Sequence, residues 1–316
     1  MNSPESSQWK SVLHCPLCGE ANYKNVGRLL GESYSFGQEV IPFPDDGIGM
    51  AECPRCSLFF KLTIPAPVFL SEVIARQIKN IWNLSCDFSI EKSLIEEEIG
   101  PGSFDMLDIG ASRGEFLAAF STTEGRRSAL DVVMHPVLEK CLRGEFIHGF
   151  IDDSTISWSG DPYDLLVMFD VLEHLYDPAE AFCNLVRMVK SDGDIVIETG
   201  DADSAWANRY GISNWYYAGV FEHHVFWTEK ALQFAASQYG LKIKKLVYKR
   251  HKYVRTFSIT MTVKLTIKAM LYQLSPKLYY RLGQLGNPGF NVQPASPFVR
   301  DHMFVVLSKG TGVADD

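Results

Sequence analysis

The sequence predicts an α/β protein in which a mostly parallel sheet carries helices on both faces, preceded by a small N-terminal zinc-binding ribbon. Three observations support this fold class. From residue 101 onward, short apolar runs alternate with helix-like segments, which is typical of parallel sheets. The first of these runs ends in a glycine-bearing turn that opens a helix. The first 62 residues hold two C-x-x-C pairs in a Gly- and Pro-rich stretch.

The composition is that of a folded protein with a sizeable core. The 316 residues are 46% hydrophobic and include 20 Phe, 13 Tyr and 6 Trp, which excludes a disordered chain. No apolar run approaches the ~20 residues of a membrane span, and the first ten residues lack the apolar region of a signal peptide. Seven Cys, with four of them in two pairs, indicate a metal site rather than disulfides. We therefore expect a cytoplasmic protein.

Composition and Pro/Gly punctuation divide the chain into zones. They are a zinc-binding ribbon at 1–62, a helical linker or lid at 63–100 with a break near 84–87, the sheet domain at 101–310 with a basic insertion at about 250–300, and a tail at 311–316.

Within the sheet domain, short apolar runs predict strands and longer mixed runs predict helices. The strands are expected at 106–109, 129–133, 146–151, 165–169, 194–198, 241–248 and 303–307. The helices between them are expected at 115–120, 178–189 and 229–239.

The basic insertion is unusual in its charge. Between Leu241 and Arg300 there are eight Lys and four Arg but no Asp or Glu, whereas the remainder carries 18 basic and 38 acidic residues. Such asymmetry indicates a face that meets something anionic. The segment is either an ordinary solvated surface, a patch for a nucleotide- or lipid-linked substrate, or a peripheral contact with the inner face of a membrane. We hypothesise anion binding through Lys249, Arg250, Lys252 and Arg255.

The secondary structure of 256–285 is left open by the sequence. From 257 to 267, apolar residues alternate with Ser, Thr and Lys at the period of a strand. The stretches 268–274 and 277–285 instead look helical on either side of Ser275-Pro276.

The two C-x-x-C pairs, Cys15–Cys18 and Cys53–Cys56, have the spacing of zinc knuckles. Two residues between thiolates let both sulfurs reach one ion, and two pairs complete a closed, structural four-thiolate site. The 34 residues between the pairs suit a ribbon with an inserted loop. The alternatives are chance pairs or a redox dithiol. The other three cysteines, Cys86, Cys141 and Cys183, are expected to be buried or inert.

A glycine-bearing turn follows the first strand of the sheet domain. Gly110 and Gly114 let a ligand approach the backbone closely, because they lack a Cβ atom. Asp108 at the strand end can accept hydrogen bonds or hold a cation, and Asp131, 23 residues later, can bridge the hydroxyls of a ribose.

The sequence leaves two other interpretations of this turn open. A dinucleotide site would have the spacing G-x-G-x-x-G, whereas these glycines are spaced G-x-x-x-G. A carboxylate at Asp108 repels phosphate but suits the ammonium group of a methionine moiety. The second alternative is an ordinary tight turn of an α/β sheet.

The segment LDIGASRGEF at 107–116 resembles the first motif of class I S-adenosylmethionine (SAM) dependent methyltransferases, with Ser112 in place of the usual middle glycine. This resemblance implies a Rossmann-like methyltransferase sheet with SAM as cofactor. It places the cofactor against one group of loop and strand-end residues: Asp108, Gly110, Ala111, Ser112, Gly114 and Phe169.

Further motifs extend the resemblance over about 104–248. ALDVV at 129–133 is similar to the ribose-binding strand end, which implies contacts from Asp131 and Val132. Asp152 and Asp153 match the position of an acid near the adenine amine, and 163–178 resembles the fourth strand with its V-L-E-H element.

A zinc ribbon joined to such a domain is similar to the sugar C-/O-methyltransferase subgroup. The segment 221–243 resembles its E-H-x-x-x-[FW]-[ST] motif, although the subgroup's Tyr-x-Glu-His appears here without the tyrosine. Members of the subgroup usually carry a further C-terminal domain, for which this chain looks too short.

Methyl transfer to a hydroxyl, or to the carbon beside a carbonyl, needs a general base, and His suits this near neutral pH. The resemblance assigns that role to His223, with Glu222 orienting or sharing it, and His174 is the second candidate. His224 is expected to be structural. The aromatic residues between 206 and 217 are expected in the core or in a substrate-binding loop.

The function indicated by these features is SAM-dependent methyl transfer to a small-molecule or saccharide acceptor, which can be anionic. One alternative is an rRNA or tRNA methyltransferase that binds RNA through the ribbon. The acidic body and the absence of an N-P-P-Y type motif after the fourth strand argue against it. The other alternative is a non-catalytic binding protein on a SAM fold.

Overall fold

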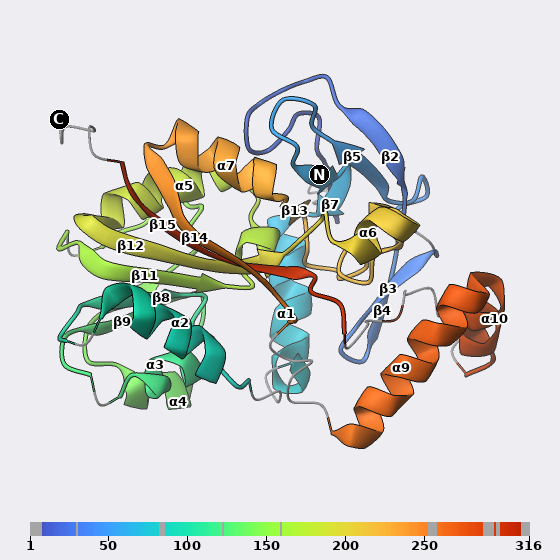
Figure 1. The fold of residues 1–316 in the computed structure, drawn as a ribbon. Coiled ribbons are helices and arrows are strands. Elements are labelled where there is room, and N and C mark those ends of the chain that lie inside the picture. The colour runs from blue at the N-terminus through green and yellow to red at the C-terminus, as the bar shows by residue number, and fades with distance from the viewer. Residues whose placement is uncertain are drawn as a thin grey trace, which may run out of the picture.

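The protein is described by a computed structural model covering residues 8–29, 31–81, 86–100, 102–121, 123–158, 160–251, 258–286, 294 and 298–310. A seven-stranded sheet with helices on both faces forms the body, and an N-terminal ribbon packs beside it (Figure 1).

The central sheet has the strand order β10-β9-β8-β11-β12-β15-β14. The first five strands pair in parallel, and β15 is antiparallel to both of its neighbours. The chain order reverses between β8 and β11, and ligands bind outside the carboxyl ends of strands at such a switch point. The strands are β8 (Met106–Ile109), β9 (Arg127–Asp131), β10 (Phe146–His148), β11 (Tyr163–Phe169), β12 (Val189–Gly200), β14 (Leu241–Lys249) and β15 (His302–Lys309).

Helices cover both faces of the sheet, which explains the continuous apolar runs of its central strands. In β11, Leu165 and Val167 face one layer while Leu166 and Met168 face the other, and all four are fully buried. One layer holds α2 (Ser89–Ile99), α3 (Glu115–Ala119) and α4 (Pro136–Cys141). The other holds α5 (Pro178–Met188) and α7 (Glu229–Gln238).

The α/β architecture predicted from the sequence is confirmed, and the errors lie at strand ends. The second strand ends at Asp131 rather than at residue 133, and the third ends at His148 rather than at residue 151. Val133 and Phe150 are exposed in the loops that follow. Their β-forming side chains suggested strand, but no neighbouring strand reaches them there.

The ribbon is a small antiparallel sheet of β2 (Lys24–Arg28), β5 (Gly49–Glu52) and β6 (Phe59–Lys61). A fourth strand, β13 (Val225–Phe226), comes from the body and pairs with β6. Two short ladders accompany this sheet: β1 (Trp9–Ser11) with β7 (Thr63–Pro65), and β3 (Ser33–Phe36) with β4 (Glu39–Pro42).

The predicted helical zone is confirmed by α1 (Pro67–Ile81) and α2. The residues expected to break it are only partly described, because 82–85 lie outside the described residues. A further helix, α6 (Ala205–Tyr210), begins the long connection after β12.

The basic insertion contains a helical hairpin of α9 (Ile259–Leu274) and α10 (Pro276–Gly286), so the strand alternative is wrong. Ser258 caps α9 by accepting from the Met261 N–H at 3.2 Å, and Pro276 occupies the first turn of α10, where its missing N–H costs nothing. The short alternation was misleading because the apolar residues also recur at three- and four-residue spacing over the whole helix. Among the described helices, none is both long and apolar enough to cross a membrane.

Lys249 does not belong to an exposed anion-binding patch, which corrects the hypothesis made from the sequence. It is buried at the end of β14, between the carboxylates of Glu91 and Glu198. The distance from its Nζ to Glu198 Oε2 is 2.6 Å. Arg250 is exposed, while Lys252 and Arg255 lie outside the described residues.

We predict that Lys249→Ala lowers the free energy of unfolding by about 3–5 kcal/mol, because two buried carboxylates would lose their cation. Urea unfolding followed by circular dichroism measures this. Lys242→Ala, an exposed lysine of the same strand, is the matched control and should change the free energy by less than ~0.5 kcal/mol. Equal effects of the two substitutions would contradict the prediction.

Candidate functional site

A cavity of about 530 Å³ opens at the carboxyl ends of β8 and β11, at the switch point of the sheet. This volume lies in the range of small-molecule sites. The turn after β8 forms one wall, and the segment 216–223 after β12 forms another. Two larger cavities, of about 650 and 680 Å³, lie beside α7 and beside α2 and α3, and neither contains a histidine among its described lining residues.

The glycine turn can adopt its conformation only with Gly at one critical position. Gly110 has φ +72°, and a Cβ atom there would lie 2.5 Å from Val171 Cγ2. Ser112 has φ +49°, which is uncommon for a residue with a side chain. The structure thus places Ser112 in the left-handed conformation that a glycine would adopt without strain.

Gly114 serves packing rather than the cavity. A Cβ atom at this position would lie 2.9 Å from Leu138 Cα, so the glycine lets α3 approach α4 closely. It does not line the cavity.

The residues predicted to bind the cofactor fall into two groups in the structure. Five line the cavity: Asp108, Gly110, Ala111, Ser112 and Phe169. The other five, Gly114, Asp131, Val132, Asp152 and Asp153, are not among its lining residues.

The Asp131 side chain is hydrogen-bonded to the backbone of the glycine turn. Its Oδ2 accepts the Ser112 N–H at 2.8 Å, and its Oδ1 accepts the Val133 N–H at 3.1 Å. Burial raises the pKa of Asp131, while these backbone donors oppose that rise. The carboxylate therefore fixes the strand end against the turn, which is where the sequence placed a ribose ligand.

Asp152 and Asp153 organise the loop after β10. Asp152 Oδ2 accepts the backbone N–H groups of Tyr176 and Asp177 at 2.8 and 3.1 Å. Asp153 is bonded to the Thr155 N–H and hydroxyl, both at 2.8 Å. The adenine contact expected from these two acids remains a prediction.

Two histidines, His174 and His223, line the cavity near the segment 216–223. In each ring Nδ1 contacts a backbone carbonyl, and Nε2 lies on the other side of the ring. His223 Nδ1 lies 2.8 Å from the Tyr217 carbonyl, and His174 Nδ1 lies 3.0 Å from the Glu222 carbonyl. A carbonyl only accepts, so each Nδ1 carries a proton. In His223, whose pKa is lowered, the neutral ring then keeps its lone pair on Nε2. The ring centroids are 4.8 Å apart.

His223 is held in its neutral form. It is 6% exposed, and burial, helped by the nearby His174 and Lys61, holds its pKa well below the usual value. A neutral imidazole with a free lone pair can accept a proton from an acceptor bound in the cavity.

The carboxylates beside these histidines have different surroundings from those expected. Glu222 lines the cavity, and burial raises its pKa, but the group that orients His223 is the carbonyl of Tyr217. Glu173 is fully buried and accepts hydrogen bonds from Thr199 Oγ1, at 2.8 Å, and from the Tyr217 hydroxyl. Glu173 therefore positions Tyr217, whose carbonyl in turn holds His223.

The ribbon fixes the segment that carries these histidines. Lys61 of β6 is fully buried, donates from Nζ to the Val220 carbonyl at 2.7 Å, and donates its N–H to the His224 carbonyl at 3.0 Å. β13 continues directly from His224 and pairs with β6. Residues 220–226 are thus bracketed by contacts with the ribbon.

The sequence did not reveal a group of side chains on the far side of the cavity. Asp170 has φ +54° and its Oδ2 lies 2.9 Å from His251 Nε2, and both residues line the cavity. The His302 ring lies behind His251 at 4.2 Å, with its Nδ1 2.9 Å from Asp301 Oδ1. One ligand atom from each of Asp170, His251 and His302 lies within 4.8 Å of the others, so these three could hold a divalent cation.

Only one signal in the sequence could have indicated this group, namely the position of Asp170 directly after a buried strand. His302 begins the antiparallel strand β15, and this orientation alone brings it to the edge where the parallel strands end. His251 follows β14 at the same edge.

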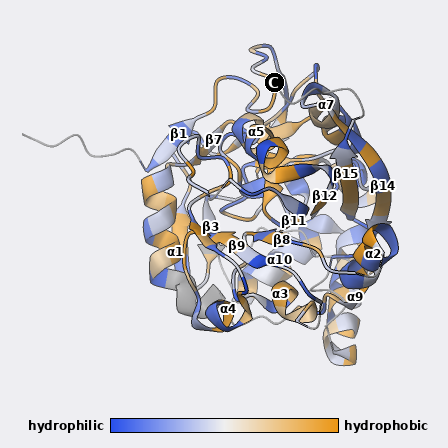
Figure 2. Ribbon diagram, turned by 90° about the vertical axis from the view of Figure 1, so that its left-hand side faces the viewer, coloured by the Kyte–Doolittle hydropathy of each residue, from blue (hydrophilic) through white to orange (hydrophobic). Residues whose placement is uncertain are grey.

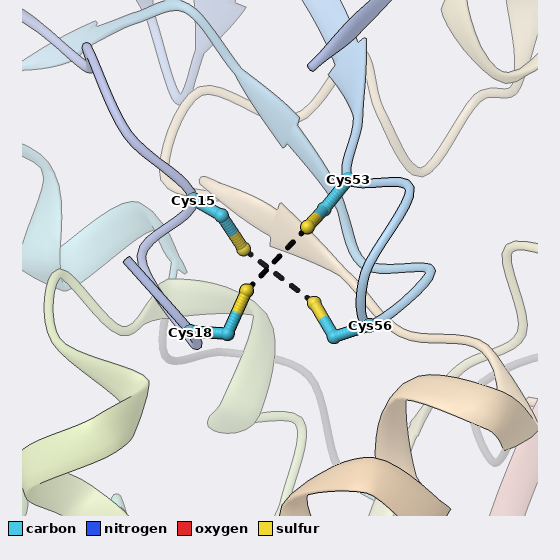
Figure 3. A group of neighbouring side chains, drawn as sticks. All are labelled: Cys15, Cys18, Cys53 and Cys56. Carbon is cyan, nitrogen blue, oxygen red and sulfur yellow. Dashed lines mark hydrogen bonds between the residues drawn. The ribbon is translucent and has the colours of Figure 1, made fainter. Parts of the chain in front are cut away.

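The four ribbon cysteines converge as their spacing predicted (Figure 3). The sulfurs of Cys15 and Cys56 are 3.5 Å apart, as are those of Cys18 and Cys53, and all four lie within 4.8 Å of one another. Zinc–sulfur bonds of about 2.3 Å require sulfur separations of about 3.8 Å in a tetrahedron. The donor set and its dimensions therefore fit a structural zinc ion.

The remaining cysteines and aromatic residues were only partly predicted. None of Cys86, Cys141 and Cys183 is buried; Cys183 is exposed, and Cys86 lies on the cavity wall. Of the aromatic run, Trp206 and Trp215 are in the core, whereas Tyr216 and Tyr217 line the cavity. His224 is 1% exposed and faces a separate cavity of about 230 Å³ beside the ribbon.

Several solved structures of methyltransferases resemble this fold at low sequence identity. One is the 1,6-didemethyltoxoflavin-N1-methyltransferase of Burkholderia thailandensis with bound S-adenosylhomocysteine, 13% identical, with a TM-score of 0.48, covering 85% of this chain and 98% of that one. Another is a TehB-like SAM-dependent methyltransferase of Corynebacterium glutamicum, 16% identical, with a TM-score of 0.43, covering 77% and 100%. A search of curated protein sequences found no match.

The family model described as a methyltransferase domain matches residues 85–246. These residues include the glycine turn, Asp131, His174 and His223 of the cavity wall, strands β8 to β13 and the first residues of β14. Because the match spans just over half of the 316 residues, this chain belongs to the methyltransferase domain family and is a SAM-dependent methyltransferase.

Proposed function

We propose that the protein transfers a methyl group from SAM to a hydroxyl, or to the carbon beside a carbonyl, of a small-molecule or saccharide acceptor. The observation that carries this proposal is the pair of histidines, His174 and His223, that line the same cavity as the glycine turn and have Nδ1 bonded to backbone carbonyls. A base is needed only where the acceptor must lose a proton during transfer.

The glycine turn offers the features that the cofactor requires. Gly110, with φ +72°, lets the chain turn sharply beside Val171, and Asp108 supplies a carboxylate at the strand end, 4% exposed and on the cavity wall. When bound, SAM supplies an electrophilic methyl group. The chain's own task is then to align the acceptor with that group and to exclude water.

His223 is the proposed general base, and His174 is the second candidate. Tyr217 and the buried Glu173 fix the His223 ring, so that its Nε2 presents a lone pair to the acceptor. Tyr216 and Tyr217 add aromatic and hydroxyl surface to the same wall, which suits a sugar or a planar acceptor. This composition supports the sugar-modifying subgroup over an RNA methyltransferase, because a cavity of about 530 Å³ suits a single small acceptor.

We further propose that the four ribbon cysteines bind one structural zinc ion. Its effect on the reaction is indirect: zinc would hold the knuckles that lead into β6, and β6 pairs with β13 next to the histidine segment.

The first prediction concerns the cofactor. Calorimetric titration of the purified protein with S-adenosylhomocysteine should show binding, and Asp131→Ala should weaken it by about 10- to 100-fold, because the turn loses a charge-assisted hydrogen bond. Asp192→Ala, at an exposed acid near the start of β12, is the matched control and should bind as wild type. Absence of binding to folded wild-type protein would overturn the proposal.

The second prediction concerns the base. His223→Gln should lower kcat by about 10²- to 10⁴-fold with an acceptor in hand, while S-adenosylhomocysteine affinity stays unchanged. Because the pKa of His223 is depressed, its neutral form persists below pH 6.5, so the wild-type rate should not fall as pH drops through 6.5. His148→Gln, an exposed histidine of β10, serves as control. If His174→Gln removes the rate and His223→Gln does not, the base is His174.

The third prediction concerns the metal. Elemental analysis should find about one zinc per chain, and Cys53→Ser should lower it about tenfold or more together with the melting temperature. Cys183→Ser, which removes an exposed cysteine outside the cluster, should change neither. Full zinc content in Cys53→Ser would show that the metal lies elsewhere.

A further inference from the structure

The helical hairpin of α9 and α10 leaves an unusual amount of apolar surface uncovered. Five large side chains of α9 are more than half exposed, with Ile259 at 86% and Leu274 at 82%. Isolated exposed apolar residues are common, but a contiguous group marks an interaction site. The five are Ile259, Val263, Ile267, Met270 and Leu274.

These residues form one stripe along α9. Their spacing of four, four, three and four residues keeps them on a single face of a helix with 3.6 residues per turn. The buried residues Ala269 and Tyr272 lie on the opposite face, where Tyr272 packs 4.9 Å from the ring of Tyr210 in α6. The stripe therefore points away from the body, and α9 protrudes from it (Figure 2).

The second helix repeats this arrangement. Leu278, Leu282 and Leu285 recur at spacings of four and three and are 45%, 48% and 81% exposed. Tyr279, on another face, is buried against the ring of Tyr272. Both helices thus use their aromatic residues to pack inward and their aliphatic residues to face solvent.

Cations accompany both stripes and anions are absent from them. Lys264 and Lys268 follow one side of the α9 stripe, and Lys277 and Arg281 follow the α10 stripe; all four are exposed. No Asp or Glu occurs between 258 and 286. Long basic side chains beside an apolar face can keep their charges at lipid head groups while their methylene stems extend the apolar surface.

We propose that the α9–α10 hairpin docks the protein on an anionic lipid surface, with the two aliphatic stripes entering the head-group region and the four cations contacting lipid phosphates. Charge decides between this occupant and a second copy of the chain. A two-fold dimer through the stripes would bring the cations of two hairpins together with no carboxylate on either to offset them. An anionic leaflet supplies that charge.

The docked hairpin would lie beside the wall of the cavity that the segment 216–223 forms. α9 packs on α6 through Trp206 and Tyr210, and α6 opens the connection that continues to Tyr216 and Tyr217. In Figure 1 the hairpin lies at the edge of the body, on the side of β3, β4 and α6. This placement favours acceptors carried at the lipid surface. Docking itself rests on the hairpin alone and does not depend on the proposed methyl transfer.

Co-sedimentation of the full-length protein with vesicles tests the proposal. Vesicles of phosphatidylcholine with phosphatidylglycerol should bind it, and vesicles of phosphatidylcholine alone should bind it much more weakly. Raising the salt concentration should release protein, because the Debye length falls from about 10 Å at 0.1 M to about 3 Å at 1 M. No cofactor or acceptor is present, so a failure here is separate from a failure of S-adenosylhomocysteine binding.

Two variants with matched controls separate the apolar and charged contributions. Ile267→Ser/Met270→Ser should reduce vesicle affinity about tenfold or more, whereas Val40→Ser/Val68→Ser, at equally exposed sites in β4 and α1, should not. Lys264→Gln/Lys268→Gln should reduce it about 25-fold, at about fivefold for each cation, whereas Lys140→Gln/Arg143→Gln, at exposed sites near α4, should not.

The outcome that overturns the proposal is equally specific. The hairpin is not a lipid-docking element if anionic vesicles fail to bind the wild-type protein. The same conclusion follows if they bind Ile267→Ser/Met270→Ser and Lys264→Gln/Lys268→Gln as tightly as the control variants. Sedimentation velocity tests the alternative, a dimer formed through the stripes. If the wild-type protein is a dimer that does not bind vesicles, and Ile267→Ser/Met270→Ser converts it to a monomer, the stripes serve self-association instead.

Discussion

The arrangement of the active site depends on the pairing of a ribbon strand with a strand of the methyltransferase body. β13 is only two residues long, and it has no partner in the central sheet. Its pairing with β6, together with the bonds that Lys61 makes to Val220 and His224, determines where the histidine segment lies. Bonds to the body hold this segment as well, since the His224 N–H donates to the Glu173 carbonyl at 2.7 Å and His174 Nδ1 lies 3.0 Å from the Glu222 carbonyl.

These contacts give the ribbon a structural role at the wall of the cavity. The proposed zinc ion would hold its ligands within a few tenths of an ångström, and the knuckle of Cys53 and Cys56 leads directly into β6. Lys61 of β6 connects the ribbon to the histidine segment through its bonds to Val220 and His224. Burial holds the pKa of Lys61 well below its usual value, which lets the residue lie in the core without the full cost of a buried charge. Burial also lowers the pKa of His223 and so favours the neutral imidazole, the form that its proposed role as base requires.

The opposite wall of the cavity illustrates a second constraint, the reversed direction of β15. Because β15 is antiparallel, its first residue, His302, and the preceding Asp301 lie where the parallel strands end. They join Asp170 and His251 in a cluster of acids and imidazoles beside the cavity. The Tyr216 hydroxyl donates a hydrogen bond to Asp301 Oδ2 at 2.8 Å, so the cluster is also bonded to the cavity wall formed by 216–223. The cavity is therefore enclosed by polar groups from four separate strand ends and their following loops.

The sequence by itself determined the α/β class, the ribbon cysteines, the glycine turn and the histidine-bearing segment, because each depends on local spacing. Asp108, Gly110 and Ser112 are neighbours in the chain, and short-range geometry suffices to place them together. The tertiary structure alone decided what the acids bond to: Asp131 accepts from the glycine turn, Asp152 from the backbone of Tyr176 and Asp177, and Asp153 from Thr155 in its own loop. It also decided that 259–286 forms helices with their aliphatic faces exposed, since a pattern of apolar residues does not say what covers them. The cluster of Asp170, His251 and His302 required the direction of β15, which no local pattern encodes, because strand direction is set by packing across the whole sheet.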